Sequence, residues 1–223
     1  MLKLTNKEFK KVVASCKPFF PLIPDTRPKL NGVWFGSDYA TILTGITIHR
    51  CFYDEKDYKG DGVFVPLVDI KTLEKQIKGL KDRIVVIPEL DEENVIPEIK
   101  SIYDNAKRTG FHWLYKEDIK MIRAVLKEMI RDEDTYIDID MSDKDMSIVG
   151  ASNGVRLSIG RSCQYPSPTT IRVQPKALLR CLKVVNRVKM SYNTGSKWLS
   201  DGLAGQSICF NYPESESLLL RIK

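Results

Sequence analysis

Long apolar runs are missing from the sequence. No segment approaches the roughly 20 apolar residues that a membrane-spanning helix requires, and no signal-type apolar core follows Met1. We therefore expect a cytoplasmic protein without a membrane partner. Hydrophobic and charged residues make up 43% and 29% of the 223 residues, as in globular proteins, so the chain can build one large or two small cores.

Side chains that bind metals are scarce and badly spaced. The sequence has two histidines and five cysteines, and no two cysteines form a Cys-x-x-Cys pair. Zinc sites in proteins are built from closely spaced Cys and His ligands. We therefore expect no His/Cys metal site, no cofactor, and reduced, structural cysteines. The residues concerned are His49, His112, Cys16, Cys51, Cys163, Cys181 and Cys209.

One acidic cluster is a candidate for metal chemistry. Asp138, Asp140, Asp143 and Asp145 straddle a predicted hairpin turn, where aspartate is common, and the glycine and final glutamate of a calcium-binding loop are missing. No Ser, Cys or carboxylate is spaced to pair with His49 for catalysis. We expect no catalytic residue and no bound metal. A small metal-dependent nucleic-acid enzyme, such as a nuclease that uses this cluster, is the alternative.

A basic pattern, in contrast, is repeated along the chain. The net charge is only +6, but segments 6–17, 69–81, 116–131 and 175–185 have helical periodicity with Lys or Arg on one side and apolar residues on the other. Like charges at i,i+4 repel, so solvation alone favours mixed faces. A repeated face of one sign indicates a polyanion. The cations concerned are Lys7, Lys10, Lys11, Lys71, Lys75, Lys78, Lys120, Arg123, Lys127, Lys176, Arg180, Lys183 and Arg187.

The predicted elements occur twice in the same order. Each half reads helix, strands, helix, strands, and Thr5 with Glu8 forms a capping box before the first helix. We predict an α+β fold with a duplicated unit, antiparallel sheets outside and two helices per domain on one face. Domains over 1–88 and 111–223 are joined by a connector over 89–110, with a short helix near 96–106. The predicted strands cover 32–35, 39–52, 63–68, 83–87, 135–141, 145–150, 155–161, 170–173, 188–192, 207–212 and 217–222.

Short blocks in both halves share the pattern of one known family. Residues 151–158 read ASNGVRLS and residues 43–51 read LTGITIHRC, which keeps a His-Arg pair. Both resemble the ATDGHRLA turn of bacterial DNA sliding clamps, the β subunit of DNA polymerase III. Segments 65–80 and 173–178 are similar to the family's strand into a vPakaL helix, and segment 212–222 is similar to its closing MPMRL.

The resemblance implies a duplicated DNA-clamp domain in a processivity factor, not an enzyme. Such a protein encircles duplex DNA without sequence specificity and has a DNA polymerase and a clamp loader as partners. The resemblance thus makes the cations of the four helical segments candidate DNA-binding residues, which would hold the phosphates and read no bases. Bacterial β subunits have three domains, whereas this length holds two, as in archaeal, eukaryotic and some phage clamps. If six domains close the ring, two per chain imply a homotrimer. A clamp-fold accessory protein that does not encircle DNA is the second alternative.

The resemblance also implies a pocket for partner peptides. In the family, polymerases and the clamp loader insert a short peptide between the His-Arg turn of one domain and the C-terminal strand of the next. Carried over, the pocket residues are Thr47, Ile48, His49, Arg50, Cys51, Leu218, Leu219, Leu220, Arg221 and Ile222. The last strand would pair with the peptide backbone. The alternative is that 218–222 is only an edge strand that closes the second sheet.

Overall fold

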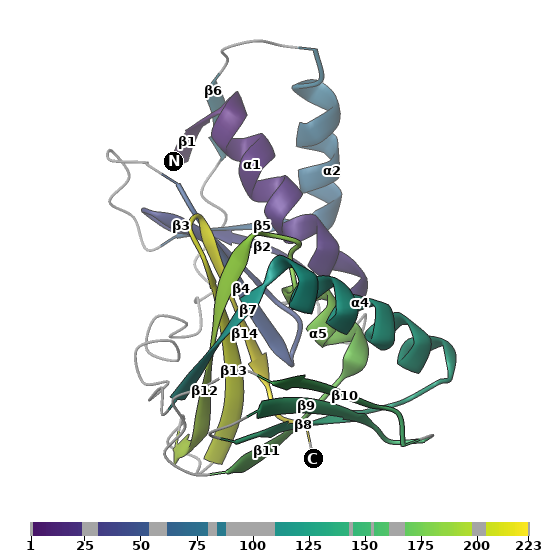
Figure 1. Ribbon diagram of the computed structural model, residues 1–223. Helices are drawn as coiled ribbons and strands as arrows, with labels where there is room; N and C mark the ends of the chain where they lie inside the picture. Colours follow the sequence, from purple (N-terminus) through teal and green to yellow (C-terminus); the bar gives the residue numbers. More distant parts are fainter. Residues whose placement is uncertain are drawn as a thin grey trace. The chain divides into compact units, whose positions relative to one another are not determined.

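The computed structural model describes residues 2–23, 31–53, 62–79, 84–87, 110–142, 145–152, 154–160, 168–197 and 204–222. They belong to two compact units (Figure 1). Unit 1 comprises Met1–Ile99 and Pro213–Glu216, and unit 2 comprises Lys100–Tyr212 and Ser217–Lys223. The C-terminal part of the chain therefore returns briefly to unit 1 before it ends in unit 2. The predicted short helix near 96–106 lies outside the described residues.

In its described residues, unit 1 combines two α-helices and a 3-10 helix with two groups of antiparallel strands. Strands β5, β2, β3 and β4 lie side by side in that order, and β1 pairs with β6. The elements are β1 (Leu2–Thr5), α1 (Asn6–Cys16), the 3-10 helix η1 (Lys17–Leu22), β2 (Gly32–Phe35), β3 (Tyr39–Leu43), β4 (Thr47–Phe52), β5 (Val63–Pro66), α2 (Leu67–Gln76) and β6 (Ile84–Ile87).

Unit 2 repeats this plan and extends it. Strands β10, β9, β8 and β11 form one antiparallel sheet, and β14, β13, β12 and β7 lie side by side in another. The elements are β7 (Gly110–Tyr115), α4 (Lys116–Arg131), β8 (Ile137–Met141), β9 (Asp145–Gly150), β10 (Arg156–Gly160), β11 (Thr169–Val173), α5 (Pro175–Cys181), β12 (Arg187–Lys197), β13 (Ala204–Tyr212) and β14 (Ser215–Leu220).

The two units share one topology, which confirms the predicted duplicated α+β fold. In each, a strand leads into a helix, three strands form a meander, and a fourth strand leads into a second helix and a last strand. The strand before the second helix pairs with the first strand of the meander, β5 with β2 and β11 with β8. The strand after that helix pairs with the first strand of the unit, β6 with β1 and β12 with β7.

Both units begin with a strand, whereas the sequence analysis began both with a helix. Strand β1 alternates buried Leu2 and Leu4 with exposed residues, and β7 buries His112 and Leu114. In both cases the strand runs into its helix without an intervening turn. The two-residue repeat of buried positions in the strand is therefore short and is followed at once by the 3.6-residue repeat of the helix. The longer helical pattern concealed the strand.

The observed helix boundaries agree with the predicted ones where residues next to the boundary determine it. The predicted capping box is present: the Glu8 amide donates to Thr5 Oγ1 at 3.2 Å, and the Thr5 amide donates to Glu8 Oε2 at 3.1 Å. Helix α4 covers the predicted 116–131. Helix α2 begins two residues earlier than predicted, directly after Pro66, and ends at Gln76 before a turn in which Gly79 has a φ of +84°.

Helix α5 is shorter than the predicted 175–185, because tertiary contacts hold its end. The Tyr212 hydroxyl donates to the Cys181 carbonyl at 2.6 Å and accepts from the Lys183 amide at 2.9 Å. The backbone of Leu182 is already extended, with φ −86° and ψ 97°. These bonds satisfy polar groups that a helix end leaves open, and they send the chain toward β12. The basic stripe predicted to reach position 187 is therefore interrupted.

Apolar side chains fill each unit between its sheets and helices. In unit 1, Phe9 of α1 stacks on Phe35 of β2 with ring centroids 6.2 Å apart. In unit 2, a common cluster joins both helices and both sheets, and all its members are buried: Leu114, Ile122, Ile139, Met146, Ile148, Leu178, Leu182, Met190 and Phe210. Each unit thus has its own core, which fixes the outward face of its helices.

Candidate nucleic-acid interface

Exposed cations lie on the helices of both units. Helix α4 buries Ile119, Ile122 and Leu126, so the positions between them point to solvent. Helix α1 buries Phe9 and Val12 in the same way. The members of the predicted DNA-binding set that are exposed on these helices are Lys7, Lys10, Lys71, Lys75, Lys120, Lys127, Lys176 and Arg180, and Lys78 and Arg187 are exposed outside them. The helices of each unit therefore carry cations that phosphates could reach.

Some of these faces also contain carboxylates. Lys120 forms an ion pair with Glu117 one turn earlier, at 3.2 Å, and half-buried Lys11 lies 3.2 Å from Glu214. Both pairs are largely exposed, where an ion pair contributes at most about 1 kcal/mol and is easily exchanged. The cations remain available to a stronger polyanion, but the face of α4 is of mixed sign.

Four predicted cations do not lie on an exposed helical stripe, and the first is Lys78, which follows the end of α2 at Gln76. Arg123 of α4 is half-buried, and its guanidinium donates to the carbonyl oxygens of Leu179 and Leu182 at the end of α5. Lys183 lies beyond α5, with its ammonium 5.3 Å from the centroid of the Tyr212 ring. Arg187 is the first residue of β12. Arg123 thus joins α4 to α5, and Arg187 belongs to a sheet.

The first-half residues of the predicted peptide pocket are occupied by contacts within unit 1. The His49 ring is fully buried, stacks on Phe19 with centroids 4.5 Å apart, and has Nε2 2.8 Å from Ser15 Oγ. Thr47, Ile48 and Cys51 are buried as well. Gly45, at a φ of +88°, allows the tight turn before them. His49 is therefore packed inside unit 1, and its serine partner lies 34 positions away, where sequence spacing gave no indication of it.

Arg50 has a buried acidic partner that the sequence analysis missed. Its guanidinium donates to Glu216 Oε1 through Nε and Nη2, and the two side chains are only 12% and 8% exposed. The Tyr39 and Phe52 rings lie 5.2 and 5.8 Å from the same guanidinium. Arg50 and Glu216 are 166 positions apart, so no local pattern could have indicated the pair.

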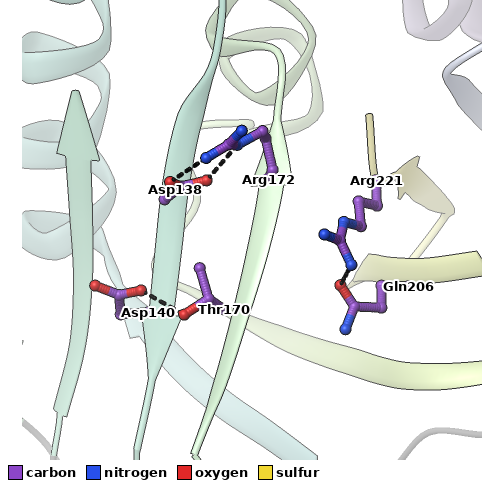
Figure 2. A network of polar contacts seen from close by, with 6 residues as sticks. All are labelled: Asp138, Asp140, Thr170, Arg172, Gln206 and Arg221. Atoms are coloured by element: carbon purple, nitrogen blue, oxygen red, sulfur yellow. Dashed lines mark hydrogen bonds and ion pairs between the residues drawn. The ribbon is translucent and has the colours of Figure 1, made fainter. Parts of the chain in front are cut away.

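The C-terminal residues of the predicted pocket belong to unit 2. Leu218 and Leu219 are fully buried, whereas Leu220 is half-buried. Arg221 is exposed and donates from Nη1 to Gln206 Oε1 at 2.8 Å (Figure 2). The Ile222 amide donates to the Arg172 carbonyl of β11 at 3.0 Å. The pocket itself stays a prediction.

The acidic cluster is held by structural contacts (Figure 2). Asp138 accepts two hydrogen bonds of 2.9 Å from Arg172, and Asp140 accepts one of 2.7 Å from Thr170. These pairs lie directly opposite each other in β8 and β11, and the hydrogen bond with Asp138 raises the pKa of the Arg172 guanidinium. Asp145 accepts from Ser142 at 2.7 Å, and position 143 lies outside the described residues. No group of three or more His, Cys, Asp or Glu among those described could hold a metal ion.

The described cysteines fit the predicted structural role. They are free and buried at Cys16, Cys51, Cys181 and Cys209. Burial raises the pKa of the Cys181 thiol well above its ordinary value, which disfavours the reactive thiolate. Position 163 lies outside the described residues.

Solved structures with the same fold are DNA sliding clamps. The chain shares an antiparallel duplicated α+β architecture with bacterial DNA polymerase III β subunits, so its fold is that of a sliding clamp. It superposes on the subunit from Borrelia burgdorferi with a TM-score of 0.70 and 12% sequence identity, over 100% of this chain and 64% of that one. The clamp from Bartonella birtlesii superposes with a TM-score of 0.68 and 15% identity, over 100% of this chain and 65% of that one. The subunit from Thermotoga maritima superposes with a TM-score of 0.68 and 9% identity, over 100% of this chain and 65% of that one.

Sequence comparison adds no closer relative. The sequence matches no protein-family model and no curated protein. The chain spans about two thirds of the length of the clamp chains it superposes on, 64–65% for those above. Among the helices described, none has the length and apolar character to cross a membrane.

Proposed function

We propose that this protein is a DNA sliding clamp that encircles duplex DNA without sequence specificity and tethers a DNA polymerase. The observation that carries the proposal is the set of exposed Lys and Arg on the helices of both units of a clamp fold. Such side chains hold phosphates electrostatically and read no bases, which suits a protein that moves along DNA. Polymerase and clamp loader are the partners this role requires.

Retention on DNA tests the role of the helical cations. The triple variant Lys10→Glu, Lys75→Glu, Lys176→Glu reverses exposed charges on three helices. We expect it to slide off, or fail to load on, closed circular duplex DNA that retains the wild type. The matched control Lys3→Glu, Lys17→Glu, Arg131→Glu changes the charge equally at exposed positions outside the proposed set. Equal loss of retention in both triples would contradict the proposal.

An edge of unit 2 offers a route to ring closure. In unit 1, β4 receives the returning segment 213–216: the Phe52 amide donates to the Glu214 carbonyl at 2.9 Å, and Arg50 pairs with Glu216. Strand β10 is the counterpart of β4 and lies at one edge of its four-stranded sheet. Arg156 of β10 is exposed and donates to Ser147 Oγ at 2.8 Å.

We infer that β10, at the edge of its sheet, pairs with a strand of another copy, so that three chains close a ring. Light scattering tests this with chains of 25.5 kDa. We expect a homotrimer at micromolar concentration and a smaller species for Arg156→Glu, with Lys3→Glu as the control. If the wild type stays monomeric with DNA and loader present, the proposal of a closed clamp is wrong, and a clamp-fold accessory protein becomes the better interpretation.

We infer that the polymerase is held through a short peptide that binds at the C-terminal segment 218–222. Because Leu218 and Leu219 are fully buried, changes there would disturb folding, so the test uses exposed Arg221 and half-buried Ile222. We expect the variant Arg221→Ala, Ile222→Ala to weaken binding of a labelled C-terminal polymerase peptide at least tenfold while the oligomeric state is kept. Undiminished peptide binding would reduce 218–222 to a structural strand.

A further inference from the structure

One face of the second sheet of unit 2 combines aromatic rings with cations. On β7, His112 and Leu114 are buried, so Phe111, Trp113 and Tyr115 lie on the opposite face. Tyr115 is 38% exposed, and the other two rings are half-buried. Phe111 and Trp113 contact each other edge-to-face, with centroids 6.3 Å apart. The rings therefore form a row along one strand.

The neighbouring strand supplies the cations of this face. Val188 and Met190 of β12 are buried, so Arg187 and Lys189 lie on the same face as the rings. Register places Arg187 opposite Tyr115 and Lys189 opposite Trp113. Diagonally, the Arg187 guanidinium lies 3.9 Å from the Trp113 centroid, and the Lys189 ammonium lies 4.4 Å from the Phe111 centroid. We call Phe111, Trp113, Tyr115, Arg187 and Lys189 the aromatic-basic face.

This face lies away from the core and the helices of unit 2. Leu114 and Met190 point to the opposite side, where they meet Ile122 of α4 and Leu178 of α5. Arg187 therefore cannot belong to a helical stripe with Lys176 and Arg180. The sequence predicts that Arg187 lies on a helical face, but in the structure it lies on a sheet beside aromatic rings. A ligand of this face therefore meets rings as well as cations.

Three adjacent strands of this sheet contain no acidic residue. Neither β7, β12 nor β13 has an aspartate or glutamate, although the chain has 29 of them. A cation over the face of an aromatic ring is attracted by the ring quadrupole, and no carboxylate of these three strands competes for it. The face thus offers positive charge and flat apolar surface together.

We propose that the aromatic-basic face binds single-stranded nucleic acid, in addition to the duplex contacts of the helices. Bases stack on aromatic rings without regard to sequence, while Arg and Lys hold the backbone phosphates. Alternate residues of a strand are about 6.7 Å apart, a spacing that an extended single strand can match with successive bases. Strand β7 lies at the end of its strand order, β14-β13-β12-β7, so a ligand strand can run along it.

The stacking geometry favours a nucleic acid over an acidic peptide. A peptide carboxylate would be satisfied by Arg187 and Lys189 alone and would gain nothing from a row of rings at every second position. A nucleic acid uses both components, because each nucleotide brings a flat base and a negative phosphate. An acidic peptide is therefore the competing outcome of the test.

Fluorescence anisotropy with a labelled 20-nucleotide oligo(dT) tests the proposal on the full chain. We expect Trp113→Ala to weaken binding about tenfold through loss of one stacked base and to leave the salt dependence unchanged. We expect Arg187→Glu with Lys189→Glu to weaken binding further and to lower the slope of log K against log salt by at least about 1.4, because each lost phosphate contact removes about 0.7. Lys3→Glu, an exposed cation on the strand of unit 1 that corresponds to β7, is the control and should bind as the wild type does.

A second measurement avoids variants that might fold poorly. Oligo(dT) containing 5-iododeoxyuridine is photo-crosslinked to the wild type, and the modified peptide is mapped by mass spectrometry. Crosslinks at Phe111, Trp113 or Tyr115 support the proposal, and crosslinks confined to other segments overturn it. Unchanged affinity in both variants, or a poly-glutamate peptide that binds as tightly as oligo(dT) and displaces it, would also overturn it.

The two proposed DNA sites can fail independently. The helical variant Lys10→Glu, Lys75→Glu, Lys176→Glu should lose retention on circular duplex and keep oligo(dT) binding at the aromatic-basic face. The double variant at Arg187 and Lys189 should show the reverse. If both variants lose both activities to the same extent, the aromatic-basic face is not a separate site.

Discussion

Removal of the carboxylate of Glu216 should destabilise unit 1 far more than an ordinary surface change. The Arg50 and Glu216 side chains are 12% and 8% exposed, and the guanidinium is flanked by the Tyr39 and Phe52 rings. Breaking one partner of a buried pair leaves an uncompensated charge and costs about 3–5 kcal/mol. For Glu216→Gln we expect about 3 kcal/mol, or a Tm lower by about 6–12 °C in a chain of this length.

The neighbouring pair in the same returning segment provides the control. Lys11 and Glu214 are 36% and 70% exposed, so Glu214→Gln should cost no more than about 0.5 kcal/mol. Thermal unfolding followed by circular dichroism compares the two variants directly. Hydrogen exchange at the Phe52 amide, which donates to the Glu214 carbonyl at 2.9 Å, reports whether 213–216 opens locally in Glu216→Gln.

Replacement of both partners separates charge burial from packing. The double variant Arg50→Met, Glu216→Leu leaves no unpaired charge, and apolar replacements of buried pairs are often close to neutral. It should therefore be more stable than Glu216→Gln alone. If Glu216→Gln and Glu214→Gln lower the Tm equally, or if the double variant is the least stable of the three, the reasoning about the buried pair is wrong.

Three further changes have distinct expected results. Tyr212→Phe removes two hydrogen bonds at the end of α5 and should cost about 1–3 kcal/mol at pH 7. Burial raises the pKa of the Tyr212 phenol, so its contribution to stability is full below the unfolded pKa near 10 and falls progressively as the pH rises from there through the folded pKa. Denaturant unfolding from pH 8 to 11 should therefore show a smaller alkaline loss in Tyr212→Phe. Thr5→Ala removes the capping box of α1 and should cost about 1 kcal/mol by urea unfolding, whereas no loss would mean that α1 is held by packing alone. Millimolar Mg²⁺ should leave the Tm unchanged in the wild type and in Asp138→Asn, because Asp138 is paired with Arg172; a Tm raised by Mg²⁺ in the wild type alone would restore the metal-site alternative.

Local signals in the sequence were sufficient for most of the fold. In α4 the buried positions recur every three or four residues over a 16-residue segment. A pattern of this spacing and length is typical of a helix. The capping box at Thr5 and the turn glycine at Gly154, with a φ of +65°, are equally local. Duplication of the pattern then predicted the duplicated topology.

Errors occurred where distant residues decide the structure. Helical periodicity continues past Cys181, but Tyr212 and Arg123 end α5 there through contacts with its last carbonyls. The buried partner of Arg50 lies in a segment that no pattern connects to β4. Both features depend on residues brought together only by folding, and single-sequence reasoning has no access to them.

Comparison of the two units within one chain shows which surfaces have the same character in both. The helices carry exposed cations in each: Lys7 and Lys10 on α1, and Lys120 and Lys127 on α4. The sheet faces differ. Unit 1 exposes Ile84 and Val86 on β6, at 63% and 44%, where unit 2 has Arg187 and Lys189 on β12.

A surface with the same charge in both units fits a ligand that meets both, as duplex DNA would inside a ring. A surface that only one unit has fits a ligand that meets that unit alone. Solvation gives no reason for the rings of β7 and the cations of β12 to share one face of a sheet with no acidic residue in β7, β12 or β13. The aromatic-basic face is therefore the feature of this chain that the clamp fold by itself explains least.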